Sequence, residues 1–367
     1  MRGYSDLDAR GRALSLPVLT WPRRRKLWRF LLFCTSICGC ADGNSERQVP
    51  TTRVQARPIL TDKKALDAPW DVVVSPKGVA FVLDFGNRQV DRLDPRTGQL
   101  AAHFGRPGAG PGEFELPLAM GLVADTLMIV DAGNRRLTSY SVDGSYLGDR
   151  PLHSIPTGRT TIGVDGSLAV ELRGAGGFLV GVLDRRDVYR RVGALSGLEG
   201  PWNFTAIRAE ARAGRIHPIT RSQVIGVAGA DGVVWVIKQT ENLILQFDRD
   251  GKEVSRTNLL SHEEWEAVLR DYIEANTAET RPDVIHPLVP AVDAKVIGSS
   301  LFVLLGPTVG PGATLIEFDS TGQRRRKLIV EGADQPFRFW LDPTRKQLLI
   351  SSVAEASIYT AAIPALK

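Results

Sequence analysis

The residue types that most often perform chemistry in proteins are few in this chain and do not fall into metal-binding patterns. The five histidines lie far apart, at His103, His153, His217, His262 and His286. None forms an H-x-H, H-x3-H or H-E-x-x-H pair, the spacings by which one strand or helix presents two ligands to zinc. His217 and His286 each precede a proline just before a predicted strand, so they could share one rim and bind zinc. The alternative interpretation is two strand-entry turns.

The sequence also contains no motif for a thiol site or a nucleotide-binding site. Cys34, Cys38 and Cys40 are the only cysteines, and all three lie near the start of the chain. The rest of the sequence therefore offers no disulfide or thiol site. The glycine-rich run G-A-G-P-G at residues 108–112 is not a phosphate loop, because Pro111 lacks an N–H and no predicted helix follows it. We interpret it as a connector.

Two polar D-x-G-N-R turns supply the most conspicuous candidates for ligand contact. They begin at Asp84 and Asp131, and a K-Q-T-E-N turn that begins at Lys238 occupies the corresponding place further along. Glycine permits tight turns, and Asp and Asn accept local backbone hydrogen bonds, so a structural role is the favoured interpretation. A binding role is kept as the alternative for the exposed side chains and for the loop tryptophan, that is, for Asn87, Arg88, Asn134, Arg135, Lys238 and Trp202.

These turns recur because the chain is built from repeats. An apolar strand that ends in aspartate followed by a turn is found at Asp94, Asp143, Asp184, Asp248 and Asp319, and a sixth copy has Tyr359 at that place. One four-stranded unit cannot bury its apolar faces alone, so neighbouring units must stack around an axis. The pattern predicts an all-β fold, a six-bladed β-propeller of four-stranded antiparallel blades spanning residues 55–367. Residues 55–61 are predicted to be a closing strand that completes the last blade.

Two intervals between these landmarks are longer than one blade needs. Residues 193–204 predict an irregular loop, which contains Trp202. Residues 258–280 predict one inserted amphipathic helix, since Ser261 and Glu264 form a capping-box pair and apolar residues follow at helical spacing. We expect the apolar stripe of this helix to pack on the propeller rather than on a partner.

The stretch G-R-P-G-A-G-P-G-E-F-E-L-P, followed by V-D-A-G-N-R-R-L, resembles the NHL-repeat family of six-bladed β-propellers, and V-L-D-F-G-N-R-Q-V in the preceding unit does so too. The resemblance covers two repeats well and the others in outline. It implies a propeller fold. It also permits an enzyme, because six-bladed propellers include calcium-dependent lactonases and a zinc-dependent amidating lyase.

The start of the chain is expected to be a targeting segment. The net charge is +5, but residues 1–39 contribute eight cations and two carboxylates, so the remainder is slightly acidic and nucleic acid is excluded as a partner. The cluster R-R-R-K-L-W-R precedes a ten-residue apolar run at 30–39, too short to span a bilayer. I-C-G-C resembles the bacterial lipobox, which implies a signal peptide at 1–39, lipidation of Cys40 and a flexible tether over residues 40–54. The alternatives are an ordinary secretory signal, twin-arginine export or a cytosolic apolar tail.

The resulting functional hypothesis is a monomeric, membrane-tethered β-propeller in the cell envelope, facing the periplasm or the exterior. It would act without catalysis as a binding or scaffold module for a protein, peptide or glycan. The alternative is a calcium- or zinc-dependent hydrolase or lyase with its site at the propeller pore. Neither catalytic nor metal-binding residues are assigned from the sequence, and calcium is the one cofactor left open.

Overall fold

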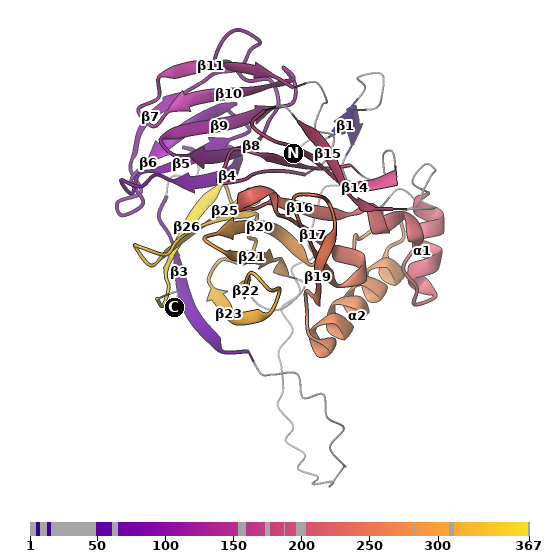
Figure 1. Cartoon of the computed structure of the whole chain (residues 1–367). Coiled ribbons are helices and arrows are strands. Elements are labelled where there is room, and N and C mark those ends of the chain that lie inside the picture. The colour runs from indigo at the N-terminus through magenta and orange to yellow at the C-terminus, as the bar shows by residue number, and fades with distance from the viewer. Residues whose placement is uncertain are drawn as a thin grey trace.

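The computed structural model describes residues 5–7, 13–15, 49–60, 65–152, 159–172, 177–186, 188–195, 203–281, 284–307 and 312–365 (Figure 1). The fold of this part is all-β and propeller-like. It contains four separate four-stranded sheets and one eight-stranded sheet, together with a small pair formed by β1 (Ser5–Leu7) and β2 (Ala13–Ser15). No helix within these ranges is long and apolar enough to cross a membrane.

Each four-stranded sheet is an antiparallel meander in which sequence neighbours pair in order. The first is β4 (Pro69–Val74), β5 (Ala80–Asp84), β6 (Gln89–Leu93) and β7 (Leu100–Phe104). The second is β8 (Pro117–Val123), β9 (Thr126–Asp131), β10 (Arg136–Ser141) and β11 (Tyr146–Pro151). The third is β12 (Thr160–Ile162), β13 (Leu168–Glu171), β14 (Phe178–Leu183) and β15 (Tyr189–Ala194). The fourth is β16 (Val224–Ala228), β17 (Val234–Lys238), β18 (Leu243–Phe247) and β19 (Glu253–Asn258).

The eight-stranded sheet joins the two ends of the chain. Its order is β20-β21-β22-β23-β3-β26-β25-β24, in which β3 (Thr51–Pro58) is the strand nearest the N-terminus. The other members are β20 (Ala291–Ile297), β21 (Ser300–Leu305), β22 (Ala313–Phe318), β23 (Arg324–Glu331), β24 (Arg338–Asp342), β25 (Gln347–Ser352) and β26 (Ser357–Ala362).

Strand β3 explains why the prediction of six separate blades is wrong in its count of sheets. Residues 51–55 pair in parallel with β23, and residues 56–58 pair antiparallel with β26. One strand therefore bridges two four-stranded units and fuses them into one sheet. The predicted closing strand is confirmed beside β26, but it begins four residues earlier than expected. Its extra length satisfies hydrogen-bonding groups that would otherwise form a sheet edge on β23.

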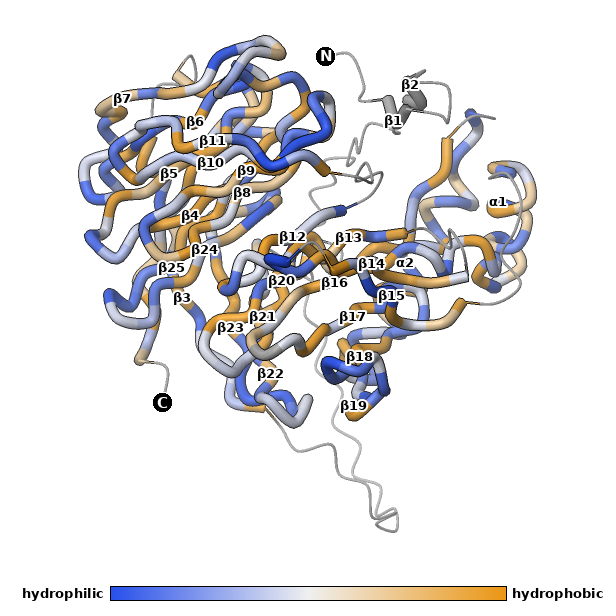
Figure 2. The backbone as a smooth tube through the Cα atoms, turned by 45° about the horizontal axis from the view of Figure 1, so that its top comes forward, coloured by the Kyte–Doolittle hydropathy of each residue, from blue (hydrophilic) through white to orange (hydrophobic). Residues whose placement is uncertain are grey.

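The core lies between neighbouring sheets. The first strands of the units contact one another in a closed ring, β4 to β8, β12, β16, β20, β24 and back to β4. Inner strands such as β5 are buried along their whole length, whereas the outer strand β11 has no buried residue. Phe81 and Leu83 of the first sheet, for example, pack with Leu127 and Ile129 of the second. In Figure 2 the strands carry most of the hydrophobic positions and the connecting turns most of the hydrophilic ones.

Helix α2 (His262–Ala278) confirms the predicted insertion. The Ser261 side chain accepts a hydrogen bond from the Glu264 backbone N–H, and the Glu264 carboxylate accepts one from the Ser261 N–H. Val268 and Tyr272 are buried in a cluster formed with β16 to β18 and β20 to β22. The apolar stripe therefore packs on the sheets, as expected.

A second helix, α1 (Phe204–Arg212), begins where the sequence predicts an irregular loop to end. Asn203 caps it by accepting a hydrogen bond from the Ala206 N–H at 3.0 Å. This helix is hard to recognise in the sequence, because only Ile207, Arg208 and Ala211 of its nine residues are buried and they form no broad apolar stripe. Residues 196–202 lie outside the described ranges.

Candidate functional site

The D-x-G-N-R turns are held together from within by their aspartates. Asp131 has no exposed surface, and its carboxylate accepts hydrogen bonds from the backbone N–H groups of Glu115 and Leu116 and from the Asn134 side chain at 2.6 Å. Asp84 does the same for Asp67, Ala68 and Asn87. A buried carboxylate saturated by N–H donors is a structural element. The two asparagines therefore serve the turn.

The two predicted arginines of these turns are surface residues. Arg88 and Arg135 are exposed, with φ of 53° and 55°, and they lie in different sheets. Arg136, which follows Arg135, has a structural role that was not predicted from the sequence. Its guanidinium donates to the carbonyls of Gly110 and Glu113 at 2.7 and 2.6 Å and to Asp149 at 2.9 Å, which fastens the glycine-rich connector to β10.

The remaining predicted candidates are not brought together. Lys238 pairs with Glu241 within its own turn at 2.7 Å. Asn242 and Gln239 of the same turn bond the backbones of Leu260 and Ala291, so this turn positions the following segments. Trp202 and Cys40 lie outside the described residues, as does His153.

The two histidines of the zinc hypothesis each have a local structural contact. The His217 ring accepts a hydrogen bond from the Ile219 N–H at 3.2 Å, and His286 lies 3.1 Å from the Glu279 carboxylate. Across the described ranges, no three His, Cys, Asp or Glu side chains are grouped so that they could hold a metal ion.

The axis of the ring is occupied by a charged network, to which we refer as the axial network. Asp293 of β20 has no exposed surface and accepts hydrogen bonds from Arg338 Nη1 at 2.7 Å and from the Phe339 N–H at 3.2 Å. Lys295 lies 3.9 Å from Asp293 and 3.3 Å from Asp71 of β4. Asp71 also accepts from the Met120 N–H of β8.

Burial alone would raise the pKa of Asp293, but Lys295, Arg338 and Arg159 outweigh it and hold that pKa below its usual value. The Asp293 carboxylate therefore stays ionised between its cations. Because the network contacts β4, β8, β20 and β24, it ties the ring across its centre. Its carboxylates are occupied by cations and backbone N–H groups.

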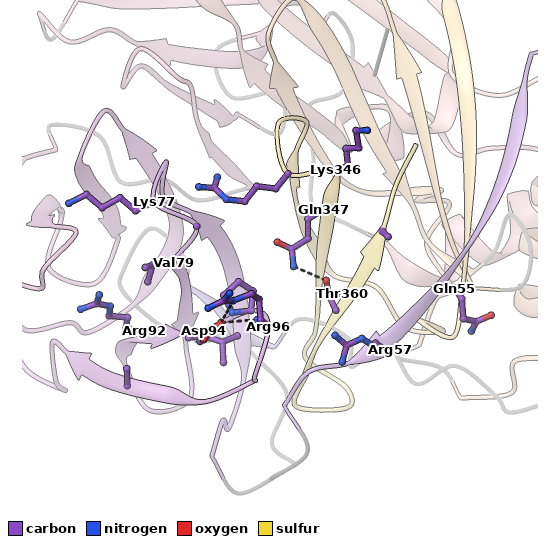
Figure 3. Close-up of a pocket in the computed structure, with 16 residues that line it drawn as sticks. Gln55, Arg57, Lys77, Val79, Arg92, Asp94, Arg96, Lys346, Gln347 and Thr360 are labelled. Atoms are coloured by element: carbon purple, nitrogen blue, oxygen red, sulfur yellow. Dashed lines mark hydrogen bonds and ion pairs between the residues drawn. The ribbon is translucent and has the colours of Figure 1, made fainter. Parts of the chain in front are cut away.

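A groove in the described surface lies away from the axis, where the first and last repeats meet (Figure 3). This groove has a volume of about 930 Å³. One wall comes from the β4–β5 turn, β6 and the β6–β7 turn. The other comes from the β24–β25 turn, β26 and β3. Its apolar lining residues include Val79, Leu93, Pro95 and Ala101. We call it the basic groove, because its charged lining residues are Arg57, Lys77, Arg92, Arg96, Arg345, Lys346 and one carboxylate, Asp94.

Among the residues that the structure describes, two of these cations have a carboxylate partner. Arg345 donates to Asp342 at 2.7 Å and to the Pro76 carbonyl, so it fastens the β24–β25 turn to the β4–β5 turn. Arg96 lies 3.8 Å from Asp94, whose pKa is lowered first of all by the Arg96 backbone N–H. Within the part of the chain that the structure describes, no ion pair or hydrogen bond of the side chain is found for the four others, Arg57, Lys77, Arg92 and Lys346.

The basic groove and the predicted turns lie at opposite ends of the sheets. Because neighbouring strands are antiparallel, the β4–β5 and β6–β7 turns are at one end of the first sheet and the D-x-G-N-R turn between β5 and β6 is at the other. The groove was visible in the sequence only as a lysine or arginine in the turns P-K-G, D-P-R-T-G and D-P-T-R-K. The first two turns belong to the first sheet and the third lies near the C-terminal end, so they meet only when the ring closes.

Comparison with known proteins gives fold-level likeness alone. No family model and no curated protein sequence matches the chain. The solved structures that resemble it are β-propeller proteins. Virginiamycin B lyase from Staphylococcus aureus is 9% identical over 85% of this chain and 99% of its own, with a TM-score of 0.46. A calcium-binding protein, regucalcin, from Agrobacterium tumefaciens is 11% identical over 87% and 98%, with a TM-score of 0.47. A putative exported protein from Bacteroides fragilis is 12% identical over 86% and 99%, with a TM-score of 0.48. At these values the functions of those proteins are not transferred to this chain.

Proposed function

We propose that this protein is a membrane-tethered, extracytoplasmic binding module that captures an anionic ligand in the basic groove. The observation that carries the proposal is the set of four cations without a partner among the described residues, gathered in one groove of a domain whose overall charge is slightly acidic. Like charges held together cost free energy that an anion recovers on binding. The partner expected from the sequence, a protein, peptide or glycan, is thereby narrowed to a ligand with carboxylate, phosphate or sulfate groups.

The proposal also includes the number of blades, the lipid anchor and the non-catalytic role that were expected from the sequence. We count the eight-stranded sheet as two blades that share β3, which makes a six-bladed propeller of the NHL type, supported by the closed ring of first strands. Cys40 is proposed to carry the lipid, with residues 41–50 as the tether. We place the activity in binding rather than catalysis, because the carboxylates at the axis are engaged by Arg338, Lys295 and backbone N–H groups.

The test is calorimetric titration of the full chain with a heparin oligosaccharide as a soluble anionic probe. A double variant removes one cation from each wall, Arg92→Gln and Lys346→Gln. We expect its affinity to fall about tenfold, since each exposed ion pair is worth up to about 1 kcal/mol. The matched control removes two exposed cations outside the groove, Arg221→Gln and Arg270→Gln. Equal losses in both double variants would show that net charge, not the groove, binds the probe, and would refute the proposal.

A further inference from the structure

We infer that the occupant of the basic groove is the anionic headgroup layer of the membrane to which the chain is tethered. This inference rests on the proposed function, because it names the ligand class of the same groove. It is carried by the path of the chain into the fold, by the length of the tether and by the position of the cations.

The tether joins β3 at Thr51, beside β23, and β3 then runs to the groove. Strand β3 runs antiparallel to β26, with Ala56 opposite Ala361 near the C-terminal end of β26. That end of β26 lines the groove through Thr360 and Ala362, and β3 itself contributes Gln55 and Arg57 (Figure 3). The first residue of β3, Thr51, pairs with Lys327 near the start of β23. The tether therefore leaves the fold close to the β22–β23 turn, at the same end of the sheets as the β6–β7 turn that lines the groove.

The length of the tether keeps this end close to the lipid. Ten residues, 41–50, separate Cys40 from β3. Fully extended, they reach at most about 36 Å, at 3.3–3.6 Å per residue. A lipid on Cys40 would confine Thr51, where the tether joins β3, to that distance from the headgroups, and Gln55 at the groove follows in the same strand. The attraction of a cation to an anionic leaflet acts within about 10 Å of the surface, and a tether that is not fully extended brings the groove into this range.

The cations are placed to meet a surface rather than a single buried anion. Lys77, Arg96 and Lys346 are exposed residues of three turns at one end of the sheets, and Arg57 is an exposed residue of β3. None of them lies in a closed cavity. A layer of phosphate groups can engage all of them at once, so their small individual contributions add. The opposite end of the first two sheets carries the D-x-G-N-R turns, whose aspartates are occupied by backbone N–H groups.

The experiment measures partition onto vesicles by co-sedimentation with lipid titration. It uses the full chain with Cys40→Ser, so that no covalent lipid contributes. The vesicles are phosphatidylcholine alone and phosphatidylcholine mixed with phosphatidylglycerol. In this background the Arg92→Gln and Lys346→Gln pair is expected to lower partition onto the mixed vesicles about 25-fold, about fivefold for each cation. The basic leader is present in every variant, so its own affinity for lipid cancels in the ratios.

The control is the Arg221→Gln and Arg270→Gln pair, which is expected to change partition by about twofold at most, since these residues lie outside the groove. Melting temperatures within about 2 °C of the parent chain confirm that each variant is folded. Equal losses in the two pairs would overturn the inference. If the groove pair loses affinity for the heparin oligosaccharide but not for the mixed vesicles, the inference fails and the proposed function stands. If the groove pair keeps its affinity for both the heparin oligosaccharide and the mixed vesicles, the inference and the proposed function both fail.

Discussion

Replacing Asp293 by asparagine is expected to lower the melting temperature of the protein by about 5–8 °C at neutral pH. The substitution keeps the side-chain shape but removes the charge that faces Arg338 at 2.7 Å and Lys295 at 3.9 Å. The two cations would then remain in the axial network without the Asp293 charge, and Asp71 would be the carboxylate left beside Lys295. Breaking a buried ion pair from one side costs about 3–5 kcal/mol. For roughly 300 ordered residues the entropy of unfolding is about 0.6 kcal/mol per degree, which gives the expected shift.

Differential scanning calorimetry of the parent chain and of Asp293→Asn measures this shift. The matched control is Asp250→Asn, which removes an exposed carboxylate in a turn and should leave the midpoint unchanged. The pKa of Asp293 is depressed in the folded state, so its stabilisation is present above the unfolded value of about 3.9 and is lost as the pH falls through the folded pKa. The difference between the two chains should therefore shrink in acid. A midpoint within about 1 °C of the parent at neutral pH would refute the view that the axial network holds the ring together.

Three further predictions follow from single residues. Asp131→Ala leaves the backbone N–H groups of Glu115 and Leu116 without their acceptor and should lower the free energy of unfolding in urea by about 2–4 kcal/mol. Arg135→Gln, at an exposed position of the same turn, should lower it by less than about 0.5 kcal/mol, and equal costs would contradict the structural role of the aspartate. Burial raises the pKa of Asp91 to about 6, so the folded state holds a proton that the unfolded state releases, and the stability from this group is lost as the pH rises from about 4 to 6. The stability difference between the parent and Asp91→Asn should change by up to about 3 kcal/mol over this window, and a pH-independent difference would count against it. Cys40→Ser should move the protein from the membrane to the soluble fraction of cells fractionated in about 1 M salt, which screens the attraction of the basic groove to headgroups. Continued membrane association under these conditions of a chain processed after residue 39 would exclude lipidation.

The features predicted correctly from the sequence depend on short-range patterns. The Ser261 and Glu264 capping box is formed by residues three apart, and the apolar spacing after it fixes which face of α2 is buried. The structural role of the D-x-G-N-R turns was likewise predicted, because Asp84 and Asn87 contact each other within one turn. The closing strand was recognisable because a propeller must cover its last edge.

The features missed depend on contacts between residues far apart in the chain. Helix α1 has too narrow an apolar stripe to stand out, and it is stabilised in part by Arg208 and Arg212, which donate to the carbonyls of Arg281 and Glu279. The joining of the last two units into one sheet depends on the pairing of residues 51–55 with β23, which no local pattern encodes. Arg136 differs from Arg135 by one position, and only the folded connector shows which of the two it binds.

By itself the sequence determined the repeating strands, their turns and the inserted α2, because each of these follows from local propensity and from the period of apolar residues. The tertiary structure alone decided where charge gathers. Arg57, Lys77, Arg92 and Lys346 come from the two ends of the chain, and only closure of the ring brings them to one groove. Asp293 and Asp71 share Lys295 for the same reason. Electrostatic interactions depend on distance in space, and that distance is set by the closed ring rather than by separation along the chain.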